Sequence, residues 1–107
     1  MAKTNGKDGS FRSLGVLAVS GKPADVAIAD LDGDGRADLI TANYETRDIA
    51  VLMGRGGGRF APVHRVSVGP YSLPHEVAVG DLDLDGRLDV VTINANTHDV
   101  TVLLGSP

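Results

Sequence analysis

The sequence predicts an all-β fold built from two copies of one structural repeat, and three observations support this prediction. An aspartate-rich loop occurs twice, at 30–38 and 81–89, and the second copy lies 51 positions after the first. The similarity extends past the loops, because 26–54 aligns with 77–105 without a gap. Short runs rich in Val and Ile flank each loop, which is typical of β-strands. A period of about 50 residues with four strands in each unit indicates the blade of a β-propeller.

Each unit is expected to contain four short strands, which in the first unit lie at 26–30, 37–42, 48–53 and 60–68. Before the loop, the bulky side chains of Val26 and Ile28 alternate with alanine, as in a strand with one buried face. The third run, 49–53, is apolar on both faces, which is typical of a strand between two packed sheets. The units are therefore expected to stack as blades, since one flat sheet would leave an apolar face in water.

The aspartate loops predict two structural calcium sites in the chain. Carboxylates at loop positions one, three, five and nine bring like charges together, which is unfavourable without a cation among them. Ca²⁺ takes about six to eight oxygen ligands, so a backbone carbonyl at position seven and water would complete its shell. The expected ligands are Asp30, Asp32, Asp34, the Arg36 carbonyl and Asp38 in the first loop, and Asp81, Asp83, Asp85, the Arg87 carbonyl and Asp89 in the second.

Other interpretations of these loops fit the residues less well. Mg²⁺ demands tighter octahedral geometry, and zinc lacks ligands because the chain has no cysteine and no histidine pair at metal-binding spacing. An EF-hand needs glutamate at position twelve and a helix on each side, whereas Thr41 or Thr92 stands there beside strand patterns. Asp-Gly also occurs in hairpin turns that bind no metal, but two complete copies of the pattern favour a metal.

Composition argues against several classes of partner. The aspartates of the two loops are more than half of the 14 acidic residues, and two Ca²⁺ ions would offset the formal charge of -4. The 10 basic residues are dispersed, so no nucleic-acid partner is expected. No apolar run approaches the roughly 20 residues of a membrane span, and the N-terminus carries no signal-peptide apolar region. Millimolar calcium is an extracellular condition, which favours an extracellular or cell-surface parent protein.

Three loop residues that depart from the repeat are candidate ligand contacts. Tyr44 and Tyr71 have no aromatic counterpart, and His98 stands where the first repeat has Arg47. Loops at the rim of a fold often carry binding residues, although exposed loop side chains also vary without a role. No histidine lies at catalytic spacing from a nucleophile or a carboxylate, so no enzyme activity is expected.

The pattern as a whole resembles the FG-GAP or VCBS repeat. The resemblance rests on a strand, the D-x-D-x-D-G-x-x-D loop, a D-hydrophobic-x-V-L-x-G strand and a glycine-rich turn that ends in phenylalanine, and it covers nearly the whole chain. Such repeats form the calcium-binding propellers of integrin α-subunit heads and of some lectins and adhesins. The resemblance therefore implies a propeller fold with bound calcium. Its relatives usually carry a full ring of blades in one chain, whereas this sequence contains two.

Two blades cannot close a ring, because a propeller needs about four to eight, so self-association is expected. The second blade lacks an outer strand, while the N-terminus supplies a matching pattern: Gly-Ser-Phe at 9–11 corresponds to Gly-Arg-Phe at 58–60. Phe11 and Phe60 are expected to be equivalent core anchors. The predicted organisation is an N-terminal outer strand for a neighbouring subunit at 1–22, blade 1 at 23–70 and blade 2 at 71–107.

Strand addition of this kind is head-to-tail and closes into a ring when the angle permits. Three chains would give six blades and four would give eight, and the trimer is preferred to the tetramer. An assembly that divides its chains between two rings remains an alternative. The preferred function is a calcium-stabilised, self-assembling structural or interaction module without catalysis. The alternative is a multivalent lectin-like propeller that binds a glycan, with a protein ligand also open.

Overall fold

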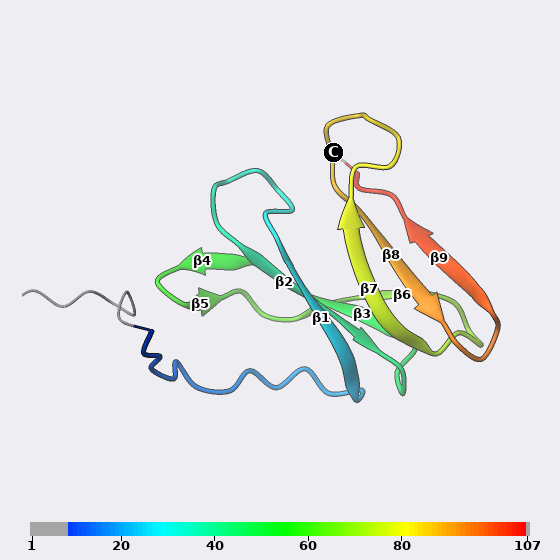
Figure 1. Cartoon of the computed structure of the whole chain (residues 1–107), viewed down its shortest axis with the longest axis horizontal. Helices are drawn as coiled ribbons and strands as arrows, with labels where there is room; N and C mark the ends of the chain where they lie inside the picture. Colours follow the sequence, from blue (N-terminus) through cyan, green and yellow to red (C-terminus); the bar gives the residue numbers. More distant parts are fainter. Residues whose placement is uncertain (1–8, 107) are drawn as a thin grey trace, which may run out of the picture.

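The computed structural model describes residues 9–106, which contain β-strands and no helix (Figure 1). The strands are β1 (Pro23–Ala29), β2 (Asp38–Asn43), β3 (Asp48–Leu52), β4 (Gly54–Gly56), β5 (Arg59–Phe60), β6 (His64–Ser67), β7 (Pro74–Gly80), β8 (Asp89–Asn94) and β9 (Asp99–Leu103). All pairs are antiparallel, which confirms the predicted all-β class. Within the described range no helix is long and apolar enough to cross a membrane. Residues 1–8 and 107, which belong to the predicted outer strand and blade 2, lie outside the described residues.

The strands form two larger sheets and one short hairpin. Sheet 1 has the order β1-β2-β3-β6, sheet 2 has the order β7-β8-β9, and β4 pairs with β5. The register repeats between the sheets, because Val26 lies opposite Thr41 in sheet 1 and Val77 lies opposite Thr92 in sheet 2. The two repeats of the sequence are therefore two copies of one sheet, and sheet 2 has one strand fewer within the described residues.

The predicted fourth strand at 60–68 is wrong in its extent. Its first residue belongs to the β4-β5 hairpin, and only His64–Ser67 (β6) pairs with β3. The glycine-rich turn at 56–58 was predicted, but the short strands β4 and β5 that it joins were not. These glycines adopt φ values of 83°, 64° and 77°, a left-handed conformation that glycine accepts at little cost and that reverses the chain tightly.

The first strand also differs from its prediction, because β1 begins at Pro23 rather than at Val26. The register shifts between Pro23 and Asp25, so an irregularity at the strand entry accommodates the residue that has no N–H to donate. Pro74 and Glu76 repeat the shift at the start of β7.

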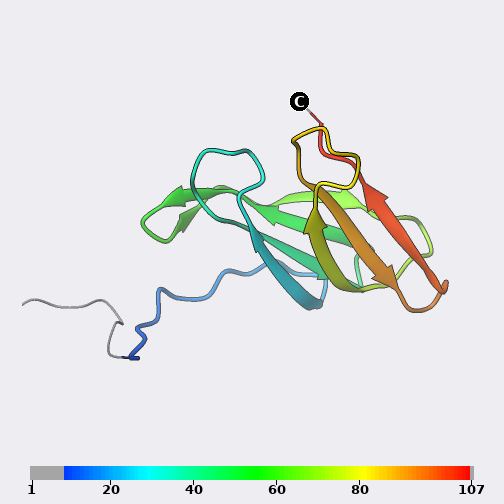
Figure 2. The same cartoon turned by 45° about the horizontal axis from the view of Figure 1, so that its top comes forward.

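The two sheets pack face to face, as predicted, through one apolar cluster. Ile40, Ala42 and Ile49 of sheet 1 are buried against Val77 and Val90 of sheet 2. Because successive strand residues point to opposite faces, this contact uses alternate positions of each strand. It places β1 beside β7, so both aspartate loops leave the molecule at one end (Figures 1 and 2).

A smaller cluster covers part of the other face of sheet 1. Val19, Ala50 and Leu52 are buried there, and Phe60 is half-buried against them, as its predicted anchor role requires. Residues 9–22 form no strand within the chain and extend away from sheet 2 (blue in Figure 1). Phe11 is 98% exposed in the single chain. Because the segment at 1–22 is predicted to complete a blade of a neighbouring subunit, the anchor role of Phe11 stays a prediction.

Candidate metal centres

Each aspartate loop connects the first two strands of its sheet. Residues 30–37 join β1 to β2, and residues 81–88 join β7 to β8. Both loops are therefore hairpin turns at the same end of the two sheets, where Figure 2 shows them side by side. The strand context that separates them from EF-hands was predicted from their flanking sequences.

Backbone amides fold each loop around its first aspartate. The Asp30 carboxylate accepts hydrogen bonds from the N–H groups of Asp34 at 3.2 Å and Gly35 at 2.8 Å. Gly35 has a φ of 84°, which turns the chain back toward the carboxylate and favours glycine. The same two bonds, with the same lengths, occur in the second loop among Asp81, Asp85 and Gly86.

Three carboxylates of each loop converge on one small space. In the first loop, oxygens of Asp30, Asp32 and Asp38 all lie within 4.8 Å of one another. Oxygens that share a Ca²⁺ ion at its usual bond length are at most about 5 Å apart, so this donor set fits a hard cation. The corresponding group in the second loop is Asp81, Asp83 and Asp85.

The two groups differ in one member, so each contains three of the four predicted carboxylate ligands of its loop. The structure leaves Asp34 outside the group of the first loop and Asp89 outside the group of the second. Asp34 accepts the N–H of Arg36 at 2.8 Å, and Asp85 accepts that of Arg87 at 2.9 Å, so this bond does not account for the difference. The carbonyl oxygens of Arg36 and Arg87 stay predicted ligands, as does the fourth carboxylate of each loop.

Crowded negative charge separates the pKa values of neighbouring aspartates. Desolvation and the adjacent Asp34 carboxylate raise the pKa of Asp32, whereas the N–H of Arg36 lowers the pKa of Asp34. In the second loop, desolvation and Asp85 raise the pKa of Asp83, and the following backbone amide lowers the pKa of Asp85. A cation among these groups would remove the repulsion, which is the electrostatic reason to expect one there.

Asp38 and its repeat counterpart have a second role that sequence reasoning missed. Asp38 is fully buried, and its carboxylate accepts the N–H groups of Leu31 at 2.8 Å and Gly54 at 2.7 Å. It therefore ties the aspartate loop to the start of β4. The buried Asp89 makes the same clamp, to Leu82 at 2.8 Å and Gly105 at 2.7 Å.

The glycines of these clamps are required by close backbone approach. A Cβ atom at Gly54 would lie 2.1 Å from the carbonyl oxygen of Ala37, and one at Gly105 would lie 2.3 Å from that of Leu88. A signal for the clamp was present in the sequence, since an aspartate is followed 16 positions later by glycine in both repeats. The spacing has no meaning until the strands are folded back on one another.

The second loop contains one strained position, which leads to a stability prediction. Leu84 has a φ of 61° and is 87% exposed, whereas its repeat counterpart Gly33 has a φ of 73°. A left-handed conformation costs a residue with a Cβ about 1 kcal/mol. We expect Leu84→Gly to raise the free energy of unfolding by up to about 1 kcal/mol, reduced by the greater freedom of glycine in the unfolded chain.

Thermal unfolding of the two variants in the same buffer measures this effect. The matched control is Gly33→Leu, which introduces the strain into the first loop and should lower the melting temperature. A lower melting temperature for Leu84→Gly would contradict the prediction.

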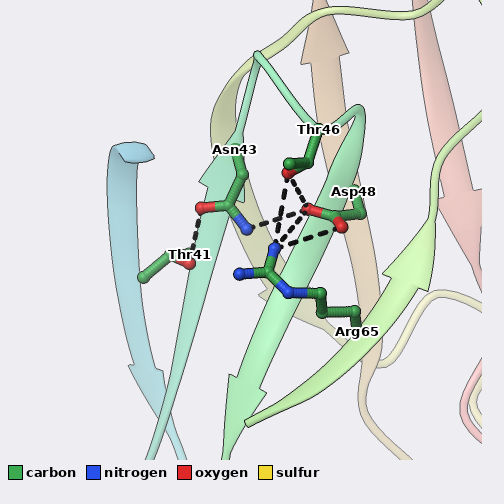
Figure 3. Close-up of polar contacts among 5 residues, drawn as sticks. All are labelled: Thr41, Asn43, Thr46, Asp48 and Arg65. Carbon is green, nitrogen blue, oxygen red and sulfur yellow. Dashed lines mark hydrogen bonds and ion pairs between the residues drawn. The ribbon is translucent and has the colours of Figure 1, made fainter. Parts of the chain in front are cut away.

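The opposite end of sheet 1 carries a polar network around the buried Asp48 (Figure 3). Thr41 donates to the Asn43 side-chain oxygen at 2.9 Å, and Asn43 donates to Asp48 at 3.0 Å. Thr46 donates to the same carboxylate at 2.7 Å, and Arg65 of β6 donates to both its oxygens at 3.2 Å. Burial opposes ionisation of Asp48, but the bonds from Thr46, Asn43 and Arg65 outweigh it and lower its pKa. The network ties β6 to the β2-β3 turn.

The three candidate ligand residues lie in separate loops. Tyr44, in the β2-β3 turn, is half-buried and stacks on His75 of β7, with ring centroids 5.4 Å apart and 6° between the planes. Tyr71, between β6 and β7, is 74% exposed, and His98, in the β8-β9 turn, has a φ of 57°. Among the described residues, no hydrogen bond or ring contact joins any two of these three. Tyr44 thus bridges the two sheets, which sequence reasoning did not foresee.

Comparison with protein-family models matches residues 30–92 to the FG-GAP-like repeat. The match begins at Asp30, the first residue of the first aspartate loop, and includes the whole second loop. It covers more than half of the chain and confirms the resemblance inferred from the sequence. Neither the curated proteins nor the solved structures searched gave a significant match.

Proposed function

The chain belongs to the FG-GAP-like repeat family, and from this premise we propose that it is a calcium-stabilised β-propeller unit that assembles with further copies of itself. Its role is that of a structural or interaction module, and the proposal assigns it no catalytic step. Family membership supports the propeller-type packing, while the metal and the assembly are supported by separate features of the chain.

One Ca²⁺ ion is proposed for each aspartate loop. Repeats of this family commonly bind Ca²⁺, and each loop brings three carboxylates close enough to share an ion. The bound ion would supply positive charge that holds the carboxylates together and fixes the hairpin turn. Asp30, Asp32 and Asp38 would hold it in the first loop, and Asp81, Asp83 and Asp85 in the second, with the remaining predicted ligands completing each shell.

The observation that carries the assembly proposal concerns the two outward faces of the sheet pair. Each outward face is the repeat copy of a face that is already packed inside the chain. Face A, the outward face of sheet 1, comprises Val26, Ile28, Leu39 and Leu52, which correspond to the inward residues Val77, Val79, Val90 and Leu103 of sheet 2. Face B, the outward face of sheet 2, comprises Ala78, Val91, Ile93 and Val100, which correspond to the inward residues Ala27, Ile40, Ala42 and Ile49 of sheet 1.

Face A of one chain should therefore pack on face B of another, as sheet 2 packs on sheet 1 within the chain. Ile28 is 69% exposed in the single chain, and Ile93 and Val100 are also exposed, so both faces present apolar surface that association would cover. The contact is heterologous, and repetition at a constant angle closes a ring. A trimer with six blades is proposed ahead of a tetramer with eight.

We expect light scattering of the calcium-loaded chain to give about three or four times the chain mass of 11.1 kDa. The Ile28→Glu variant should shift the mass to that of the monomer, because a carboxylate would be buried in the contact between face A and face B. Tyr71→Glu is a matched control, since Tyr71 is about as exposed but lies outside both faces. A wild-type mass of 11.1 kDa would refute the assembly.

A further inference from the structure

We propose that residues 15–18 of a second copy of this chain add to the edge of β9 as an antiparallel strand, in the register that places Val16 opposite Thr101. This inference rests on the proposed assembly and specifies the segment and register of the contact. In sheet 1, β3 has β2 on one side and β6 on the other. In sheet 2, its counterpart β9 pairs only with β8 among the described strands.

The register follows from two offsets in the sequence. Strand β9 follows β3 by 51 positions, and residues 9–19 precede the equivalent residues 58–68 by 49 positions. In sheet 1 the observed partners are Asp48 with Ser67, Ile49 with Val66, Ala50 with Arg65 and Val51 with His64. The equivalent partners in sheet 2 are Asp99 with Ala18, Val100 with Leu17, Thr101 with Val16 and Val102 with Gly15.

The burial of Val19 in the structure agrees with this assignment. Val68, just after β6, is buried between the sheets, and its carbonyl accepts the Thr101 hydroxyl at 2.9 Å. Val19, the equivalent residue, is buried against Ala50, which is the equivalent of Thr101. Val19 therefore contacts sheet 1 in the same way that Val68, just after β6, contacts sheet 2.

The residues before Val19 consequently lie on the side of sheet 1 where sheet 2 of a neighbouring copy would pack in the proposed assembly. They leave Val19 on the outward side of sheet 1 and extend away from sheet 2 (Figure 1). Val16 is 95% exposed, although a valine at this point of a paired strand would be covered. The outer edge of β9 has no partner among the described strands, and its Val100 and Val102 side chains are exposed. Two open segments of matching pattern thus occur at the two ends of one chain.

The polar chemistry of the two edges shows why this segment fits β9. In sheet 1, Ala50 is small, and Arg65 opposite it reaches the Asp48 carboxylate (Figure 3). In sheet 2, Asn94 donates to Asp99 at 3.1 Å and to the Thr101 hydroxyl at 2.8 Å. The Thr101 hydroxyl in turn donates to the backbone carbonyl of Val68. Hydrogen bonds within the chain therefore connect these side chains, and no arginine from a fourth strand takes part as Arg65 does in sheet 1.

The proposed partner strand is accordingly uncharged. Residues 15–18 read Gly-Val-Leu-Ala, whereas β6 reads His-Arg-Val-Ser. Val16 opposite Thr101 makes a cross-strand pair of two β-branched side chains, which suits a sheet. Each outer strand therefore matches its own edge: β6, which carries Arg65, matches β3, and the uncharged segment matches β9. This complementarity would oppose exchange of the two strands during assembly.

Engineered disulfides test the register, because the chain contains no cysteine of its own. Opposed residues of an antiparallel pair have Cα atoms about 4.5 to 5.5 Å apart, within the range that a disulfide spans. Chains with Val16→Cys and chains with Thr101→Cys are unfolded together, refolded with calcium and oxidised. Non-reducing electrophoresis then measures covalent dimers that contain one chain of each kind, which only a contact between chains can produce.

The matched control pairs Val16→Cys with Val100→Cys, whose side chain points to the opposite face of the strand. We expect at least about tenfold more mixed dimer from the 16/101 mixture than from this control. A second comparison, Leu17→Cys with Val100→Cys against the same control of Val16→Cys with Val100→Cys, tests the register on the other face. It keeps the test valid if loss of the Thr101 hydroxyl prevents folding, because neither of its mixtures changes Thr101.

The outcomes separate this inference from the proposed assembly. Efficient linkage in both test mixtures but not in the control is the expected result. Equal linkage in the control, or no linkage in either test mixture while light scattering still gives a multiple of the chain mass, overturns the register and leaves the assembly standing. A monomeric wild-type mass overturns both.

Discussion

The Asp38→Ala variant is expected to lose about 3 to 5 kcal/mol of unfolding free energy even without metal. The Asp38 carboxylate is fully buried and accepts two backbone N–H groups, from Leu31 and Gly54. Hydrogen bonds to a charged group contribute about 1.5 to 3 kcal/mol each, and their loss leaves both donors without a protein partner. Urea unfolding in excess EDTA, at one fixed protein concentration, isolates this effect from metal binding.

Asp34→Ala is the control that separates loss of the clamp from loss of a calcium ligand. Asp34 is also a predicted calcium ligand, but it accepts an exposed amide of its own loop and holds no second segment. In EDTA its removal should leave the unfolding midpoint nearly unchanged, whereas with calcium both variants should bind less metal in the first loop. Equal losses of stability for the two variants in EDTA would contradict the clamp at Asp38.

Removal of calcium from both sites is expected to lower the melting temperature by about 20 to 40 °C. A ligand at one hundred times its dissociation constant adds about 2.7 kcal/mol for each site of the folded state. For a domain of this size, 1 kcal/mol corresponds to about 4 to 8 °C. Calorimetry over a series of free calcium concentrations should therefore show a transition that rises steadily with the ion.

Stoichiometry identifies the loops as the origin of this stabilisation. Elemental analysis should find two calcium ions in each wild-type chain and one after either Asp30→Ala or Asp81→Ala, because each substitution removes a carboxylate from one group. Magnesium at the same concentration should replace little of the effect, since it gives up its water reluctantly. An unchanged transition in EDTA, together with no bound calcium, would defeat the metal proposal.

The aspartate loops and their hairpins were predictable because their chemistry is local. The spacing of Asp30, Asp32 and Asp34, the glycine that follows and the strand patterns on both sides lie within one short window of sequence. Because the second loop repeats this pattern, the same prediction of a metal-binding hairpin turn applied to it. Sheet packing was also predictable, because the run at 49–53 has apolar residues on both faces.

Contacts that join distant segments were not predictable from these patterns. The bond from Gly54 to Asp38 spans 16 residues, and the stacking of Tyr44 on His75 depends on how one sheet lies against the other. The role of Phe11 depends on such a contact as well. It has the same local pattern as Phe60, but its predicted partner is a neighbouring copy of the chain, and in the single chain it is exposed.

The passage from β6 directly into β7 joins one whole sheet to the next. A period cut between these two strands is one complete sheet, whereas a period cut elsewhere begins partway through one sheet and ends partway through the next. A recombination event that adds or removes one whole period would still leave every interior sheet with the same strand order. Genes of this kind can therefore change the number of their repeats without a crossover at a structural boundary.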